Sequence, residues 1–185
     1  DYEFMDVFET ISFHHTKPWG FGEGGIIICN KVHEKQIINL INFGAENFQK
    51  NHKFGLNAKI SDLACAAILN RIKTMNMWSK KYEIQKQRML KLLKENFSSM
   101  AIFYKKNKTP VNFIPVFFNK KTNGENLKNS KSLTFRKYYR PLTNKKIKNC
   151  KAEKMYDHIL CIPTHSEIEK ISDKKIIQDI NSIFK

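Results

Sequence analysis

The chain has 185 residues, 41% of them hydrophobic, which suits one medium domain or a piece of a larger protein. Lysine and arginine total 33 against 17 acidic residues, so the formal net charge is +16. No apolar run approaches the roughly 20 residues that span a bilayer, and no secretory leader opens the chain. We therefore expect a cytoplasmic protein with no membrane partner.

The positive charge on its own is typical of a nucleic-acid-binding module. Most of it lies in Lys-rich and Asn-rich sequence from residue 80 to 151, which lacks the Gly-aromatic signature of common RNA-binding modules. A solvated surface is the favoured interpretation, and an anionic substrate would also be attracted by this field. We expect no specific nucleic-acid partner.

The first half of the chain is predicted to contain two strands and then helices. Apolar and β-branched residues predict a strand over residues 5–13 and a second, buried strand over residues 25–29. Helical spacing predicts a helix over residues 32–43, with Gly44 at its C-terminal cap. Because the first residues already enter a strand, we expect an N-terminal part to precede Asp1.

Longer helices and a smaller α+β unit are predicted to follow. Ser61 has the character of an N-cap, and a second helical stretch runs over residues 78–97. The later elements are a strand at 111–118, a polar loop at 120–131, a strand at 133–136, a helix at 152–156, a strand at 158–162 and a helix at 173–184.

One segment carries a dense chemical signal, Ser12-Phe13-His14-His15-Thr16-Lys17-Pro18 followed by Gly22-Glu23-Gly24-Gly25. A lysine in a loop between two buried strands can be partly desolvated, which leaves its amine available for a Schiff base. The Ser12 hydroxyl could point at a phosphate, and the glycines let the backbone approach a flat cofactor. A solvated loop lysine would be the better interpretation of Lys17 without the joint pattern.

This segment resembles the cofactor-lysine motif of the DegT/DnrJ/EryC1/StrS family of pyridoxal-phosphate-dependent sugar aminotransferases. The resemblance continues in the Gly55-Leu56-Asn57 loop that leads into an Ala-rich helix, in Tyr138-Tyr139-Arg140-Pro141-Leu142 and in Leu160-Cys161-Ile162-Pro163-Thr164-His165. It implies an α/β fold, namely the C-terminal part of a fold-type I aminotransferase. The implied ranges are the end of the large cofactor-binding domain at 1–76, a connecting long helix at 77–109 and a small α+β domain at 110–185.

The resemblance also implies the chemistry of the site. Lys17 would hold pyridoxal 5'-phosphate covalently and move the proton of the reaction, and Ser12 would bind the cofactor phosphate. Asn57 would reach the phosphate in the partner subunit of a homodimer, although a plain turn residue is an equally good interpretation of Asn57. The implied reaction transfers an amino group, from glutamate, to a keto group of a nucleotide-linked sugar in polysaccharide or glycoconjugate biosynthesis.

The family's acidic partner of the pyridine nitrogen and its phosphate cup lie upstream of the lysine motif, so none of them is present here. We therefore expect this fragment to be inactive alone. The alternatives are an inactive or altered protein of the same fold and, less favoured, the nucleic-acid module.

Other clusters favour structural roles. His14 and His15 are expected to face opposite ways, because side chains alternate along a strand, so no shared metal is expected. Glu23 is expected to cap a turn rather than face a substrate. Cys150, His158, Cys161 and His165 lack zinc-finger spacing, which favours core packing. With Cys29 and Cys65, the cysteines are expected to be small buried residues without a disulfide.

Overall fold

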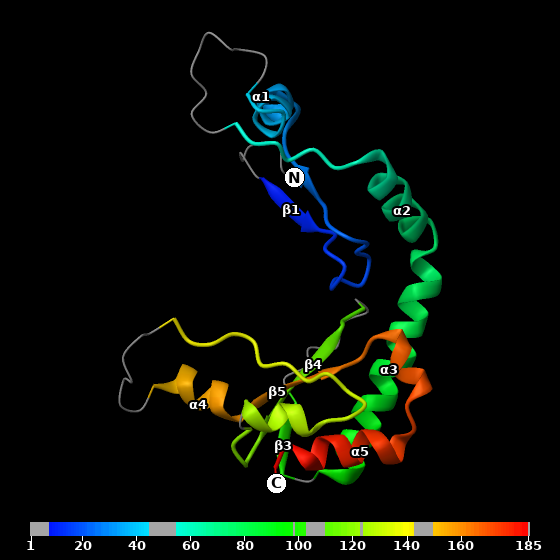
Figure 1. Cartoon of the computed structure of the whole chain (residues 1–185), viewed down its shortest axis with the longest axis vertical. Helices are drawn as coiled ribbons and strands as arrows, with labels where there is room; N and C mark the ends of the chain where they lie inside the picture. Colours follow the sequence, from blue (N-terminus) through cyan, green and yellow to red (C-terminus); the bar gives the residue numbers. More distant parts are fainter. Residues whose placement is uncertain are drawn as a thin grey trace. The chain divides into compact units, whose positions relative to one another are not determined.

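A computed structural model of the chain describes residues 8–44, 55–97, 99–102, 110–122, 124–142 and 150–184. The chain divides into two compact units, Asp1–Met75 and Asn76–Lys185. Helices and strands mix in both units, as Figure 1 shows, which confirms the predicted α/β class. None of the described helices is long and apolar enough to cross a bilayer.

The first unit is built on a two-stranded antiparallel hairpin of β1 (Glu9–Ser12) and β2 (Gly25–Ile28), followed by α1 (Lys31–Ile41) and α2 (Asp62–Lys73) (Figure 1). All residues of both strands are exposed. The prediction of a buried second strand is therefore wrong for the chain by itself. The strand stays exposed because β1 and β2, among the described strands, pair only with each other and form a sheet of two strands.

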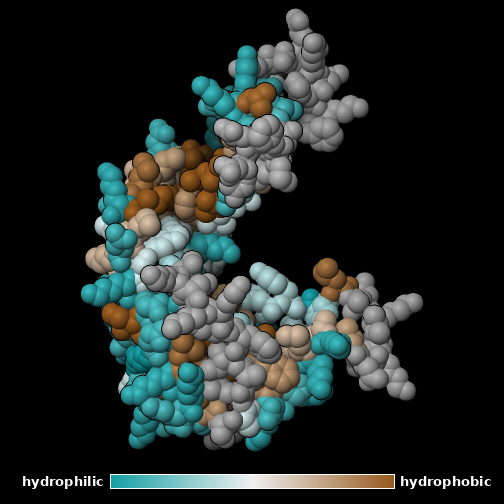
Figure 2. Space-filling view, turned by 180° about the vertical axis from the view of Figure 1, so that it is seen from behind, coloured by the Kyte–Doolittle hydropathy of each residue, from teal (hydrophilic) through white to brown (hydrophobic). Residues whose placement is uncertain are grey.

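The ends of the first-unit helices lie near the predicted positions. α1 ends two residues earlier than predicted, with Asn42 as its C-cap and Phe43 at a positive φ of 62°. Gly44, at φ 69°, follows and donates its N–H to the Asn39 carbonyl at 2.8 Å. Ser61 accepts the Ala64 N–H at 3.2 Å and so caps the start of α2. On α2, Leu63 and Leu69 are exposed, and Figure 2 shows hydrophobic surface in this region.

The second unit contains a three-stranded antiparallel sheet in the order β3 (Met100–Ile102), β4 (Phe113–Phe118) and β5 (Ile159–Pro163). Along β4 the side chains alternate between exposed and buried, so one face of the strand enters the core. The core joins the sheet to helices and includes Met89, Leu93, Ile114, Val116, Leu160, Ile162, Ile176 and Ile180.

An arginine adds polar contacts to the core packing between the long helix α3 (Met75–Asn96) and the C-terminal elements. The Arg88 guanidinium donates to the carbonyls of Ile168 and Ile171 and pairs with Asp173 at the start of α5 (Asp173–Ser182). A planar guanidinium with five N–H donors suits such a junction, because several acceptors converge on it. Ile168 belongs to the 3-10 helix η3 (Ser166–Lys170), which the sequence patterns did not reveal.

Several smaller elements differ from the predictions. β3 and the 3-10 helix η2 (Glu125–Asn129) were not expected, while α4 (Lys151–His158) is longer than the predicted helix. The predicted strand at 133–136 is reduced to an isolated bridge between Arg136 and Cys161. The alternation in this segment is real, because Leu133 and Phe135 are both buried. Apart from that bridge, the backbone N–H of Leu133 bonds to a side chain instead of a neighbouring strand.

That side chain is the carboxylate of Asp179, which is 6% exposed on α5. It accepts hydrogen bonds from the Ser130 hydroxyl and from three backbone N–H groups, those of Lys131, Ser132 and Leu133. Burial by itself raises the pKa of Asp179, but these hydrogen bonds together hold it below its ordinary value. Asp179 therefore fixes the turn at 130–133 against α5.

We predict that Asp179→Ala lowers the free energy of unfolding by about 1–3 kcal/mol, because three buried or part-buried N–H groups lose their acceptor. A depressed folded-state pKa stabilises the fold above the unfolded value of 3.8, and this contribution is lost as the pH falls through the folded pKa. Urea unfolding at pH 7 and in acid should show the gap between wild type and variant closing below about pH 4. Asp179→Asn keeps the shape without the charge, so its free energy of unfolding at pH 7 should lie between those of wild type and Asp179→Ala. A difference between wild type and Asp179→Ala that does not change with pH would contradict this account.

Candidate functional site

The loop between β1 and β2 continues the antiparallel pairing past the ends of the strands. Two backbone hydrogen bonds of 2.8 Å extend the ladder, from Phe13 N–H to the Gly24 carbonyl and from His15 N–H to the Gly22 carbonyl. The register pairs Ser12 with Gly25. Two steps further along, the same register places Glu23 opposite His14.

Lys17 lies at the tip of this hairpin, at the junction of two tight turns. Its N–H donates to the His14 carbonyl at 2.8 Å, and its carbonyl accepts the Gly20 N–H at 2.9 Å. The backbone is so close here that a Cβ on Gly20 would lie 1.8 Å from the His14 carbonyl oxygen. Only glycine fits that position, which the sequence patterns did not single out.

The tip is anchored to the rest of the first unit at two points. Phe13, at the base of the loop, is 6% exposed and belongs to the buried side chains of the unit. The Arg71 guanidinium on α2 donates to the Pro18 carbonyl at 3.2 Å. The backbone next to Lys17 is therefore held by a helix distant in sequence, a contact that no local pattern announces.

The side chain of Lys17 is exposed. The prediction that two buried strands desolvate it is therefore wrong for the chain by itself, because those strands are exposed as well. Its backbone is fixed while its amine stays accessible to solvent. Such a lysine can react with a molecule that approaches from outside the chain.

Ser12 lies on the same arm of the hairpin, five residues before Lys17, and its hydroxyl accepts the His14 N–H at 3.3 Å. Its side chain is exposed and lines a groove of about 810 Å³. Apolar residues of β1, β2 and α1 form most of that groove, and its charged lining residues are Glu23, Glu34 and Lys59. The hydroxyl is therefore available to a ligand at the edge of an apolar surface.

Asn57 lies on a separate segment of the first unit. It forms an isolated bridge with Asn42, and its neighbours Leu56 and Ala58 donate N–H groups to the carbonyls of Leu40 and Ile41 near the end of α1. Its side chain is exposed. The structure thus brings Ser12 and Lys17 together on one hairpin and fixes Asn57 beside α1.

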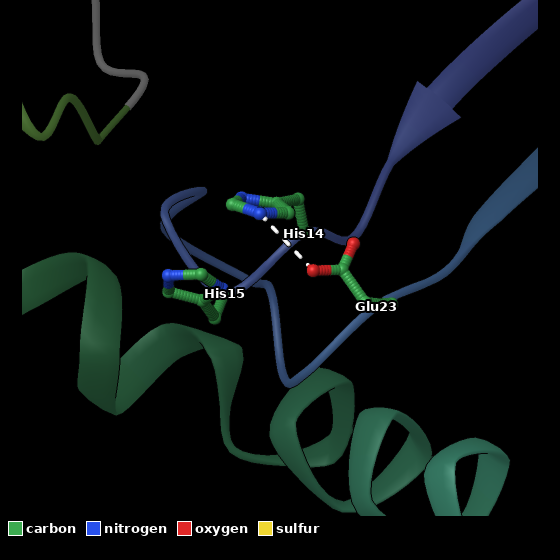
Figure 3. A group of neighbouring side chains, drawn as sticks. All are labelled: His14, His15 and Glu23. Carbon is green, nitrogen blue, oxygen red and sulfur yellow. Dashed lines mark ion pairs between the residues drawn. The ribbon is translucent and has the colours of Figure 1, made fainter.

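His14, His15 and Glu23 converge, contrary to the expectation for the two histidines (Figure 3). The imidazole rings lie 4.1 Å apart between centroids, and His14 Nε2 is 3.2 Å from a Glu23 carboxylate oxygen. Strand alternation no longer applies, because β1 ends at Ser12 and the chain turns after His14. Glu23 pairs with His14 across the hairpin instead of capping a turn, because the register places the two residues opposite each other.

The second cluster of cysteines and histidines is used in packing. Cys161 is buried in β5, and burial raises the pKa of its thiol. His158 contacts the Phe118 carbonyl at 2.8 Å and stacks on Phe117, while burial lowers the pKa of His165. All four cysteines are free, but Cys161 alone among them is fully buried, so the expectation of buried cysteines holds only there.

We predict that Gly20→Ala loosens the tip of the hairpin, since the new methyl group must move the His14 carbonyl. We expect such overpacking to lower the free energy of unfolding by about 1–3 kcal/mol. Hydrogen exchange over residues 13–24 should become faster, because amides there are bonded across the loop. Gly124→Ala is the matched control, since its Cβ would meet nothing within 4 Å, and equal exchange in the two variants would contradict the close approach.

Comparison with known proteins places this geometry in context. A model of the DegT/DnrJ/EryC1/StrS aminotransferase family matches residues 4–181. A PLP-dependent aminotransferase assigned in Bacillus cereus ATCC 10987 superposes with a TM-score of 0.75 at 22% identity, over 97% of this chain and 52% of that one. Helicobacter pylori PseC, an aminotransferase of pseudoaminic acid biosynthesis, gives 0.74 at 17% identity, over 96% and 53%.

A DegT DnrJ EryC1 StrS aminotransferase from Brucella abortus gives a TM-score of 0.71 at 18% identity, over 96% of this chain and 51% of that one. The chain thus spans about half the length of these solved structures. At such identities the structures show the fold, that of a C-terminal portion of a PLP-dependent aminotransferase. The family model matches nearly the whole chain, and the chain therefore belongs to the DegT/DnrJ/EryC1/StrS aminotransferase family.

Proposed function

We propose that this chain supplies the cofactor-lysine half of a PLP-dependent sugar aminotransferase. One observation carries the proposal: Lys17 stands at a backbone-fixed hairpin tip with an exposed amine, on the same arm as the exposed Ser12 hydroxyl. A covalent cofactor requires such a combination, since the attachment point must be held while its amine stays reachable. Membership of an aminotransferase family supports the same chemistry.

The residues of the hairpin fit pyridoxal phosphate. Opposite the lysine arm, the glycine-rich arm presents little side-chain bulk, and a Cβ at Gly22 would meet nothing within 4 Å. A flat aromatic ring can therefore approach the backbone there. The Ser12 hydroxyl lines the groove and can donate to a phosphate oxygen.

When bound, the cofactor acts as the electron sink for the carbon that exchanges its amino group. Lys17 would first hold the cofactor through its Nζ atom. Once the amino donor has displaced Nζ, the freed amine would carry the proton between the reacting carbons as a general base. Gly20 and Arg71 are positioning residues, because they fix the turn and the carbonyl beside it. Ser12 orients the phosphate and with it the ring.

The proposed substrate is a nucleotide-linked keto sugar, with glutamate as the amino donor, in polysaccharide or glycoconjugate biosynthesis in the cytoplasm. The net charge of +16 supports an anionic substrate, because a positive field raises the local concentration of a diphosphate. Helicobacter pylori PseC acts in pseudoaminic acid biosynthesis, a related kind of chemistry.

We further propose that the chain acts together with the half that its relatives possess and that this sequence does not span. The exposed apolar strands β1 and β2 support this, since Ile11, Ile26, Ile27 and Ile28 are between 38% and 48% exposed. Exposed apolar area of this kind is normally covered by further protein. The 185 residues alone then bind the cofactor weakly and do not transaminate.

We predict that the protein with its upstream half carries a visible cofactor absorption band that Lys17→Ala abolishes, because the band depends on the covalent bond to Nζ. Borohydride reduction followed by peptide mass mapping should locate the cofactor on Lys17. Lys31→Ala, an exposed lysine at the start of α1, is the matched control and should keep both band and activity. A Lys17→Ala protein that retains them would overturn the proposal.

The proposed enzyme is a homodimer in which Asn57 acts at the partner's cofactor phosphate. Asn57 is exposed, and the segment that carries it runs into α2, where Leu63 and Leu69 are exposed too. A helix with an exposed apolar face is suited to contact with a second subunit. Its Ala66 and Ala67 are small and permit close approach.

We predict that full-length Lys17→Ala and Asn57→Ala proteins, each impaired at limiting cofactor, regain activity when refolded together. Random pairing makes about half the dimers mixed, and each mixed dimer has one intact site, so about a quarter of all sites should recover. If Asn57 serves its own subunit instead, no mixture creates an intact site. Activity equal to the average of the two variants, with subunit exchange verified by mass spectrometry, would reject the shared site.

A further inference from the structure

We propose that His14, His15 and Glu23 form a binding site for a divalent transition-metal ion, with Zn²⁺ as the representative ion. Each residue offers one ligand atom, and the three atoms lie within 4.8 Å of one another (Figure 3). The three residues lie on the hairpin that carries Lys17, and Glu23 also lines the groove of Ser12. The proposed metal site uses only the geometry of this hairpin and needs no cofactor.

The backbone brings the three ligands together before any ion arrives. Phe13 and His15 donate N–H groups to the opposite arm at 2.8 Å each, which fixes Glu23 across from His14. The turn after His14 then leaves the His15 ring beside the His14 ring instead of on the opposite face. Two arms of one rigid hairpin thus supply a His-His-carboxylate set.

Two imidazoles and one carboxylate match the preferences of Zn²⁺, which takes nitrogen and oxygen ligands at about 2.0–2.2 Å. Three protein ligands leave one position of a tetrahedral ion open to solvent or to a small molecule. His14 Nε2 and the Glu23 carboxylate oxygen are 3.2 Å apart, which suits two ligands of one ion. His15 is exposed and the Glu23 side chain is 78% exposed, so both have room to change rotamer. Such a change is required to bring the His15 ring nitrogen to the same ion.

The other ring nitrogen of His14 already contacts a hydroxyl group. His14 Nδ1 lies 2.8 Å from the Thr16 hydroxyl oxygen, on the side of the ring away from Glu23. Metal-bound histidines almost always donate their other ring N–H, which sets the orientation of the ring. With the ion on Nε2, the Nδ1–H of His14 donates to the Thr16 hydroxyl, so the same contact serves the metal-bound form.

Without metal, the Thr16 backbone N–H donates to His14 Nδ1 at 3.3 Å, so Nδ1 is an acceptor and Nε2 carries the proton toward Glu23. Metal binding replaces the Nε2 proton by the ion, and Nδ1 takes up a proton from solvent, which leaves the imidazole neutral. The His14–Glu23 pair that is exchanged is partly exposed, and such surface pairs contribute little. The exchange gives up this pair and the 3.3 Å bond from the Thr16 N–H to Nδ1, and the Thr16 hydroxyl becomes the acceptor of the new Nδ1–H.

The test is calorimetric titration of the tag-free chain with ZnCl₂, together with the visible absorption spectrum of the Co²⁺-loaded chain. Wild type should bind one ion through this site and show the bands of four-coordinate Co²⁺. Thr16→Val should weaken binding roughly 10–100-fold, as the loss of a hydrogen-bond partner of a metal-bound histidine does. His15→Ala and Glu23→Gln, which remove ligands, should weaken it at least as much.

His33→Ala and Glu34→Gln are the matched controls, because they change the same residue types within the first unit but outside the cluster. Both should bind Zn²⁺ as wild type does, with all far-ultraviolet circular dichroism spectra unchanged. The proposal is overturned if His15→Ala and Glu23→Gln bind with wild-type affinity. It is likewise overturned if the Co²⁺ spectrum shows thiolate charge-transfer bands, since the four cysteines would then hold the ion.

Discussion

The antiparallel register of the first hairpin determines what the chemically interesting residues can do. Ser12 pairs with Gly25, and the two backbone bonds beyond that pair carry the same register to the tip. A shift by one residue would turn every side chain of an arm to the other face. The hydroxyl of Ser12, the amine of Lys17 and the contact of Glu23 with His14 all depend on this one alignment.

Local patterns were enough to predict much of the fold. Ser61 and Gly44 mark helix ends through contacts within a few residues, and β4 and β5 follow from apolar runs of strand length. The segment at 133–136 shows where such reasoning stops. Its alternation of buried residues is correct, but beside the bridge from Arg136 to Cys161 the N–H of Leu133 bonds to Asp179, 46 positions away. No periodicity reveals a side chain that acts as such an acceptor.

In the candidate site, too, some residues could be found from the sequence and others only from the tertiary structure. Lys17, Ser12 and Asn57 were singled out by resemblance to the family, and their roles stay predictions. The contact from Arg71 to Pro18 and the close approach of Gly20 to His14 depend on tertiary geometry. The expected desolvation of Lys17 failed because it assumed buried strands, and β1 and β2 are exposed in this chain.

The exposed hairpin affects how molecules of this chain interact with one another in solution. Among the described strands, β1 and β2 pair only with each other, and β2 has the sequence Gly-Ile-Ile-Ile. Free strand edges of β-branched apolar residues are templates for pairing between molecules, which ordered proteins normally block with charge, proline or a covering element. The lysines of this chain lie mainly elsewhere in the sequence. At high concentration, edge-to-edge pairing of hairpins from different molecules is therefore expected, and a charged residue placed within β2 would oppose it.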